Sequence, residues 1–137
     1  MLPHLVAART VVCAVIEREG KILVAQRSEE KHYPLQWEFP GGKPEAGESL
    51  EQALVREVRE ELACDIEVLH RLDVVKHDYG GEHHYELLFF ACRLVRGDPV
   101  PQPGSGLRRC EWADRRRLPD YEFLEGDREF VRRLARS

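Results

Sequence analysis

The chain lacks the sequence features of membrane proteins, secreted disulfide proteins and cysteine-based zinc proteins. No apolar run among its 137 residues reaches the length of a membrane span, and residues 1–9 lack the pattern of a secretory signal. The four cysteines show no CxxC spacing; they are Cys13, Cys64, Cys92 and Cys110. We therefore expect a cytoplasmic protein that makes no membrane contact and whose thiols are reduced and mostly buried.

An excess of positive charge is also absent. The net charge is -4, and the short run Arg115-Arg116-Arg117 is more typical of a solvated loop than of a nucleic-acid patch. This charge balance argues against duplex nucleic acid as a partner. We find no repeat or linker, and the length suits one core but not two ordinary domains. We expect a single domain over residues 1–137, acting as a monomer or homodimer.

Apolar periodicity and turn signals predict a mixed sheet flanked by helices. A helix should follow Ser49, because Ser49 and Gln52 form a capping-box pattern before a helical run of leucine, alanine and valine. The remaining elements are strands at Val11–Glu17, Ile22–Gln26 and Leu107–Ala113, a hairpin of Ile66–Asp78 and His83–Val95 turning at Gly80-Gly81, and a last helix at Gly126–Ala135.

The helix after Ser49 carries a cluster of carboxylates. At about 100° per residue, Glu57, Glu60 and Glu61 share one arc, and two of them border the apolar stripe. Three ionised carboxylates this close repel each other, and a hard divalent cation such as Mg²⁺ or Mn²⁺ relieves that repulsion. The alternative is an acidic surface paired with Arg56 and Arg59, and spacing alone leaves both readings open.

A glycine-rich loop precedes this helix. The segment Phe39-Pro40-Gly41-Gly42-Lys43 can approach a ligand closely and adopt positive φ angles. Loops of this kind at a helix N-terminus often bind phosphate, although a glycine pair is usually only a turn.

The spacing of these residues closely resembles the Nudix box of the Nudix hydrolases. From Gly42, five residues lead to Glu48, seven more to Arg56-Glu57, and Glu60-Glu61 follow. GKILVAQRS and WEFPGGK are similar to the MutT-type branch, which includes CTP pyrophosphohydrolases. Two late positions depart from the pattern, Ala63 in place of glycine and Cys64 in place of a larger aliphatic residue. We expect Ala63 to change how the helix ends.

The resemblance implies an α/β/α sandwich and an enzyme that splits nucleoside triphosphates into nucleoside monophosphate and pyrophosphate. By position in the box, Glu57, Glu60 and Glu61 would bind Mg²⁺ or Mn²⁺ together with the Gly42 carbonyl. Arg56 would orient Glu57, and Glu48 would support the cluster. Bound metal would neutralise phosphate oxygens and activate the attacking water.

One carboxylate expected from the resemblance is missing. MutT-type enzymes often place a glutamate six residues before the late-strand tryptophan, and here that position is Gly106, before Trp112. Either the site has one carboxylate fewer, or Glu82, Glu86 or Glu111 replaces it.

The nucleotide itself is predicted to meet Arg27, Phe39 and Asp127. Alignment with the family places Asp127 at the base-reading position, where a carboxylate slightly favours the amino group of cytosine and a protonated carboxyl could read an oxidised purine. Asp127 could instead be a helix N-cap. Phe39 could stack on the base or lie in the core, and Arg27 could bind phosphate or be an exposed strand charge. Trp37 fits the core best.

Two other functions remain open on sequence alone. The chain could hydrolyse another nucleoside diphosphate derivative, such as ADP-ribose or a nucleotide sugar. It could also be a nucleotide-binding module without turnover, which the intact carboxylates argue against and the missing late glutamate supports.

Overall fold

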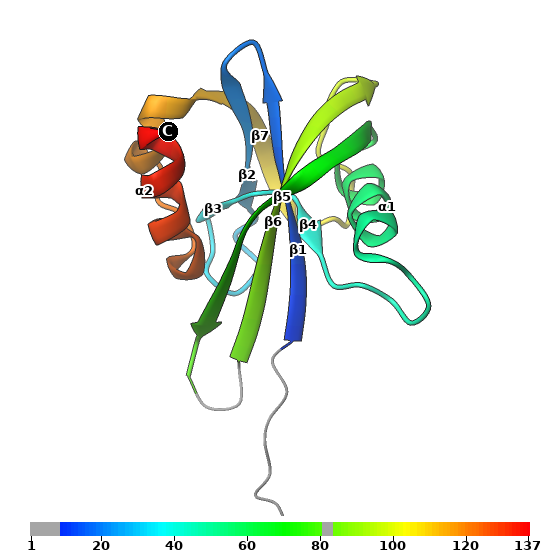
Figure 1. Ribbon diagram of the computed structural model, residues 1–137, viewed down its shortest axis with the longest axis horizontal. Helices are drawn as coiled ribbons and strands as arrows, with labels where there is room; N and C mark the ends of the chain where they lie inside the picture. The colour runs from blue at the N-terminus through cyan, green and yellow to red at the C-terminus, as the bar shows by residue number, and fades with distance from the viewer. Residues whose placement is uncertain (1–8, 81–83) are drawn as a thin grey trace, which may run out of the picture.

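A seven-stranded mixed sheet carries one α-helix on each side (Figure 1). The computed structural model describes residues 9–80 and 84–137. The strands are β1 (Arg9–Arg18), β2 (Lys21–Arg27), β3 (Trp37–Glu38), β4 (Gly41–Gly42), β5 (Asp65–Asp78), β6 (His84–Arg96) and β7 (Leu107–Asp114). The helices are α1 (Leu50–Leu62), η1 (Arg115–Asp120), η2 (Glu125–Asp127) and α2 (Arg128–Arg136).

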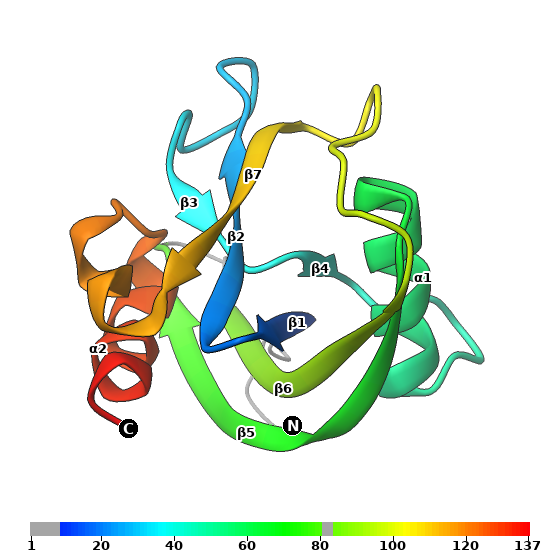
Figure 2. The same cartoon turned by 90° about the horizontal axis from the view of Figure 1, so that it is seen from above.

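Strand β1 lies at the centre of the sheet and has both faces buried. It pairs in parallel with β6 and antiparallel with β2 and β4. Side chains alternate along a strand, so β1 supplies two separate cores. Val12, Ala14 and Ile16 pack with α1, whereas Cys13 and Val15 pack on the other face, with α2. Figure 2 shows α1 and α2 on opposite sides of the strands, which confirms the expected α/β/α sandwich.

The long strands agree with the sequence prediction to within a few residues. The two-residue strands β3 and β4 and the short helices η1 and η2 were not predicted. The last helix begins at Arg128, because the residues before it form η2. The predicted hairpin turn and the first residue of its second strand extend into residues 81–83, outside the described residues. In the described part of the chain, no helix has the length and apolarity to cross a membrane.

Helix α1 has the predicted capping box and an end that differs from expectation. The Gln52 N–H donates to the Ser49 hydroxyl, and the Ser49 N–H donates to the Gln52 side chain. At the other end Ala63 adopts the left-handed conformation, with φ 54° and ψ 35°, and donates its N–H to Arg59. The expectation that Ala63 changes the helix end was wrong, because alanine can take this conformation at a cost of about 1 kcal/mol.

Candidate active site

Strand β4 holds the glycine pair directly against helix α1. Its pairing with β1 aligns Gly42 with Val12. A Cβ atom built on Gly42 would lie 2.4 Å from the Glu57 carboxyl carbon, so a side chain there would displace this carboxylate. The Gly41 N–H donates to the Glu61 carboxylate at 3.0 Å. The structure therefore brings two of the predicted metal ligands onto the same two glycines.

Arg56 lies among the carboxylates of α1 and the preceding loop. Its guanidinium donates twice to Glu48, at 2.6 and 3.0 Å, and once each to Glu57 at 3.0 Å and Glu60 at 3.2 Å. It also donates to the Lys43 carbonyl at 3.2 Å. Arg56 thus contacts Glu57, the residue that it is predicted to orient. Hydrogen bonding from Arg56 holds the pKa of Glu48 below its usual range.

The electrostatics of the carboxylates differ along the helix. Burial, and then the negative charge of Glu38, raise the pKa of Glu61 well above its ordinary value. Burial also raises the pKa of Glu57, which Arg56 partly offsets. The Glu60 side chain is 58% exposed and contacts Arg56.

The donor set suits a hard divalent cation, because it consists of carboxylates beside backbone carbonyls. Within residues 9–80 and 84–137, however, no three acidic, histidine or cysteine side chains already converge on one point. Glu57 and Glu60 accept hydrogen bonds from Arg56, whereas Glu61 accepts one from the Gly41 N–H, so the three carboxylates face different partners. Glu57 and Glu61, which both touch the glycine pair, are the best placed to receive a metal ion.

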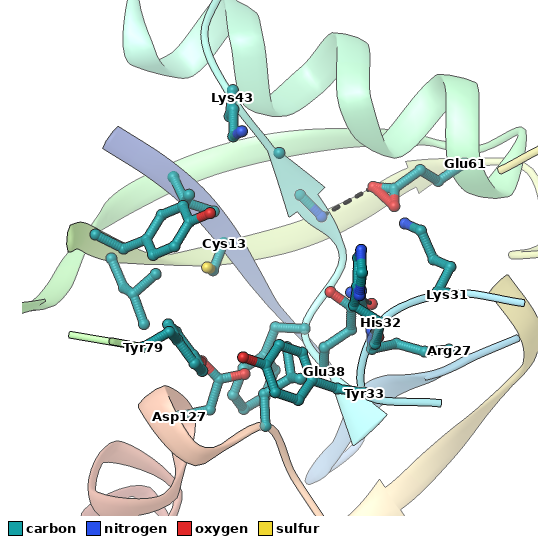
Figure 3. Close-up of a pocket in the computed structure, with 17 residues that line it drawn as sticks. Cys13, Arg27, Lys31, His32, Tyr33, Glu38, Lys43, Glu61, Tyr79 and Asp127 are labelled. Carbon is teal, nitrogen blue, oxygen red and sulfur yellow. Dashed lines mark hydrogen bonds and ion pairs between the residues drawn. The ribbon is translucent and has the colours of Figure 1, made fainter. Parts of the chain in front are cut away.

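A pocket of about 490 Å³ runs from the glycine pair to the start of α2. Figure 3 shows Glu61 and Lys43 at one end and Asp127 and Tyr79 at the other. The polar and aromatic side chains that line it include Arg27, Lys31, His32, Tyr33, Glu38, Lys43, Glu61, Tyr79, Tyr85 and Asp127. Its length and two unlike ends suit an elongated ligand with an anionic part and a polar ring.

Asp127 lies buried at the end of this pocket, with 4% of its surface exposed. Asp127 does occupy the N-cap position of α2, as the alternative predicted, but its side chain makes no capping hydrogen bond to that helix. Burial, and then the charge of Glu38, raise its pKa well above the ordinary value. A buried carboxyl group with a raised pKa facing a pocket is typical of a binding or catalytic group.

The other two predicted nucleotide contacts also line the pocket. Arg27 donates to Glu38 at 3.1 Å and to the His32 carbonyl at 2.9 Å, with 15% of its side chain exposed. It is therefore no exposed strand charge. Phe39 is buried and packs against three further phenylalanines, Phe89, Phe123 and Phe130. Of the two predictions for Phe39, a place in the core fits better than stacking on a base. Trp37 is buried too, as predicted.

Four further residues that line the pocket were not predicted from the sequence: Glu38, Lys31, Tyr33 and Tyr79. Glu38 could have been found from the sequence Trp37-Glu38-Phe39. In a strand, two buried aromatic residues place the residue between them on the opposite face. No local pattern marks the other three, which reach the pocket only through tertiary structure. The ring centroids of Tyr33 and Tyr79 lie 5.5 Å apart, across two segments distant in sequence.

None of the described candidates for the missing late glutamate lines the pocket. Glu111 accepts hydrogen bonds from Arg109 and Tyr121, both at 2.5 Å, and Glu86 also lies outside the lining. Glu82 falls outside the described residues. Glu38 is the additional carboxylate that the structure places near Glu61.

The model of the NUDIX domain family matches residues 6–134. The chain belongs to the NUDIX family. It is 37% identical over 98 residues to an 8-oxo-dGTP diphosphatase of Proteus vulgaris, which is 72% of this chain and 84% of that protein. It is 57% identical over 58 residues to a CTP pyrophosphohydrolase of Escherichia coli, which is 42% of this chain and 43% of that protein.

Solved Nudix structures share the architecture. The solution structure of MutT from Staphylococcus aureus is 34% identical in sequence and superposes with a TM-score of 0.73. The match covers 95% of this chain and 97% of that one. The residues described above therefore belong to a Nudix hydrolase fold. Members of this family generally need a divalent metal ion.

Proposed function

We propose that this Nudix protein hydrolyses nucleoside triphosphates to nucleoside monophosphate and pyrophosphate, with Mg²⁺ or Mn²⁺ as cofactor. The observation that carries the proposal is one pocket with two different ends. At one end Glu61 and the glycine pair line the pocket, with Glu57 packed against Gly42 just outside the lining, and at the other end the buried Asp127 faces the cavity. Named relatives act on 8-oxo-dGTP and CTP, which agrees with this substrate class.

Residues of α1 have separate proposed roles in binding the metal and in orienting its ligands. Glu57, Glu60 and Glu61, with the Gly42 carbonyl, would hold the metal. The metal, when bound, neutralises phosphate oxygens and lowers the pKa of a bound water. Arg56 fixes the rotamer of Glu57 and is itself fixed by two hydrogen bonds from its guanidinium to Glu48. Arg27 lies in the same pocket, paired with Glu38 at 3.1 Å, and is proposed to share its positive charge between that carboxylate and a phosphate.

Asp127 is proposed to read the base. Because its pKa is raised, the carboxyl group is more readily protonated than an exposed aspartate, and it then offers one donor and one acceptor. The pairing edge of cytosine presents the matching acceptor and donor, N3 and the N4 amino group. The O6 and N1–H of 8-oxo-guanine match a neutral carboxyl equally well, so we propose cytidine and 8-oxo-guanine nucleotides alike as substrates. Tyr33, which is 46% exposed, and Tyr79 supply aromatic faces near the same end.

The assignment is tested by Glu60→Gln. Glu60 is exposed and contacts only Arg56 among the described ion pairs and hydrogen bonds, so the fold should survive its neutralisation. Turnover should fall by about a hundredfold or more if Glu60 is a metal ligand. Glu51→Gln, on the first turn of the same helix, is the matched control and should retain activity. Full activity of the Glu60 variant would refute the assignment.

Substrate class is decided by measuring pyrophosphate and orthophosphate release with Mg²⁺. The panel contains CTP, dCTP, 8-oxo-dGTP, GTP, ATP and ADP-ribose. Pyrophosphate release from CTP or 8-oxo-dGTP is expected. Cleavage confined to ADP-ribose would replace the triphosphate proposal, and nucleotide binding without turnover would indicate a binding module.

A further inference from the structure

Lys31 occupies the space beside Gly106, the position at which this chain lacks the expected carboxylate. A Cβ atom on Gly106 would lie 2.5 Å from Lys31 Cε and 2.8 Å from its ammonium nitrogen. Gly106 also has φ +81°, a conformation that favours glycine. A side chain at position 106 would therefore collide with Lys31 in its present position and displace its ammonium group.

The backbone keeps Lys31 next to Gly106. The Ser28 N–H donates to the Gly106 carbonyl at 2.9 Å, and the Lys31 N–H donates to the Ser28 carbonyl at 3.3 Å. The loop between β2 and β3 is thus tied to the segment that enters β7. Figure 3 shows the Lys31 side chain extending from this loop toward Glu61.

The charges around Lys31 leave it available to a bound anion. Its ammonium group stabilises the ionised forms of Glu38 and Glu61 at a distance. Among residues 9–80 and 84–137, it lies within 4.0 Å of no carboxylate, unlike Arg27 and Arg56, whose guanidinium groups are already paired. A triphosphate entering a pocket that contains Glu38, Glu61 and Asp127 requires positive charge that is not already neutralised.

We propose that Lys31 binds a phosphate oxygen of the nucleotide in the pocket and that Gly106 leaves the space its side chain occupies there. This inference rests on the proposed function, since it identifies the residue that holds the phosphates of that substrate. Lysine suits the role because a flexible ammonium donates to phosphate as a point charge.

The direct test measures binding of inorganic pyrophosphate with Mg²⁺ by isothermal titration calorimetry, which needs no turnover. Lys31→Met keeps an unbranched side chain beside Gly106 and removes the charge, so affinity should fall about tenfold. Lys31→Arg should remain within about threefold of the parent. Lys21→Met, in the exposed first residue of β2, makes the same change away from the pocket and should leave binding unaltered.

Gly106→Ala supplies an independent test through a double-mutant cycle. The added methyl group would displace Lys31 and should weaken pyrophosphate binding in the parent protein, yet leave it unchanged in the Lys31→Met protein. Parent-like affinity in Lys31→Met, or an equal loss in Lys21→Met, would overturn the inference. The proposed function fails separately, if the parent protein hydrolyses no nucleotide in the panel.

Discussion

Asp127 has a raised pKa because it is buried near a second carboxylate. Its pKa is raised by loss of solvent and then by Glu38, which itself has a raised pKa because it is buried. Arg27 offsets part of this effect through its contact with Glu38. The protein thus retains a group that favours the neutral form, a cost in stability that is typical of a functional site.

Asp127→Asn should make the protein more stable at neutral and alkaline pH. Between its ordinary pKa of about 3.9 and its raised value in the folded state, Asp127 binds more protons in the native protein than in the unfolded chain. The free energy of unfolding therefore falls as pH rises through that interval. Asparagine cannot ionise, so at pH values above this interval the substitution should raise the free energy of unfolding by about 1–3 kcal/mol.

Urea unfolding of both proteins from pH 4 to pH 9 measures this difference. The two curves should meet near pH 4 and separate as pH rises. Because an amide also presents one donor and one acceptor, Asp127→Asn should keep the base preference of the parent protein. A difference in stability that does not change with pH would contradict the raised pKa.

The candidate site could be predicted from sequence only where local geometry determines it. The helical period placed Glu57 and Glu61 on the edge of the apolar stripe, and both lie at the glycine pair. Lys31 and Tyr33 could not be found in this way, because a polar loop has no period that aims its side chains. Their positions depend on contacts with Gly106 and Tyr79, remote in the sequence.

At the scale of elements, helix α1 is fixed at both ends. The capping box satisfies backbone groups at Ser49 and Gln52. At the other end, the Val100 N–H donates to the Leu62 carbonyl at 2.9 Å and the Gln102 N–H to the Glu61 carbonyl at 2.8 Å. The segment between β6 and β7 thus satisfies carbonyls that a helix leaves unpaired, and it holds the turn that carries Glu61.

Ala63→Gly should stabilise the protein by about 0.5–1 kcal/mol. Ala63 is exposed, so its methyl group contributes little packing, whereas its left-handed conformation is strained for alanine. The gain is limited because glycine also increases the entropy of the unfolded chain. Chemical denaturation measures the change. Ala53→Gly, at a buried position inside α1, is the control and should destabilise by about 1 kcal/mol or more.

The element pattern shows why short strands escape prediction from sequence. Long strands such as β1 and β6 follow from runs of buried apolar residues. The two-residue strands β3 and β4 have no pattern of their own and exist because β2 and β1 supply hydrogen-bonding partners. Strand β4 nevertheless positions the glycine pair, so a part of the site depends on pairing that only the folded chain displays.

At the scale of the whole molecule, the pocket joins the two sides of the sandwich. One end, here called the anionic end because Glu61 lies there and phosphate is proposed to bind there, is built on α1 and β4. The other end is built on residues after β5, on β6 and on the start of α2. Each end has one backbone amide bonded to a pocket side chain. The Gly41 N–H donates to Glu61, and the Gly126 N–H donates to the Tyr79 hydroxyl at 2.9 Å. Bound nucleotide should therefore stabilise both sides at once.

Hydrogen exchange of the Glu60→Gln protein measures this linkage, because that variant should bind CTP with little turnover. CTP with Mg²⁺ should slow exchange by about tenfold or more around both Gly41 and Gly126. Pyrophosphate with Mg²⁺ should slow it only near Gly41, since it fills the anionic end alone. Protection by CTP at one end only would mean that phosphates and base do not share this pocket, and Asp127 would lose its proposed role as the reader of the base.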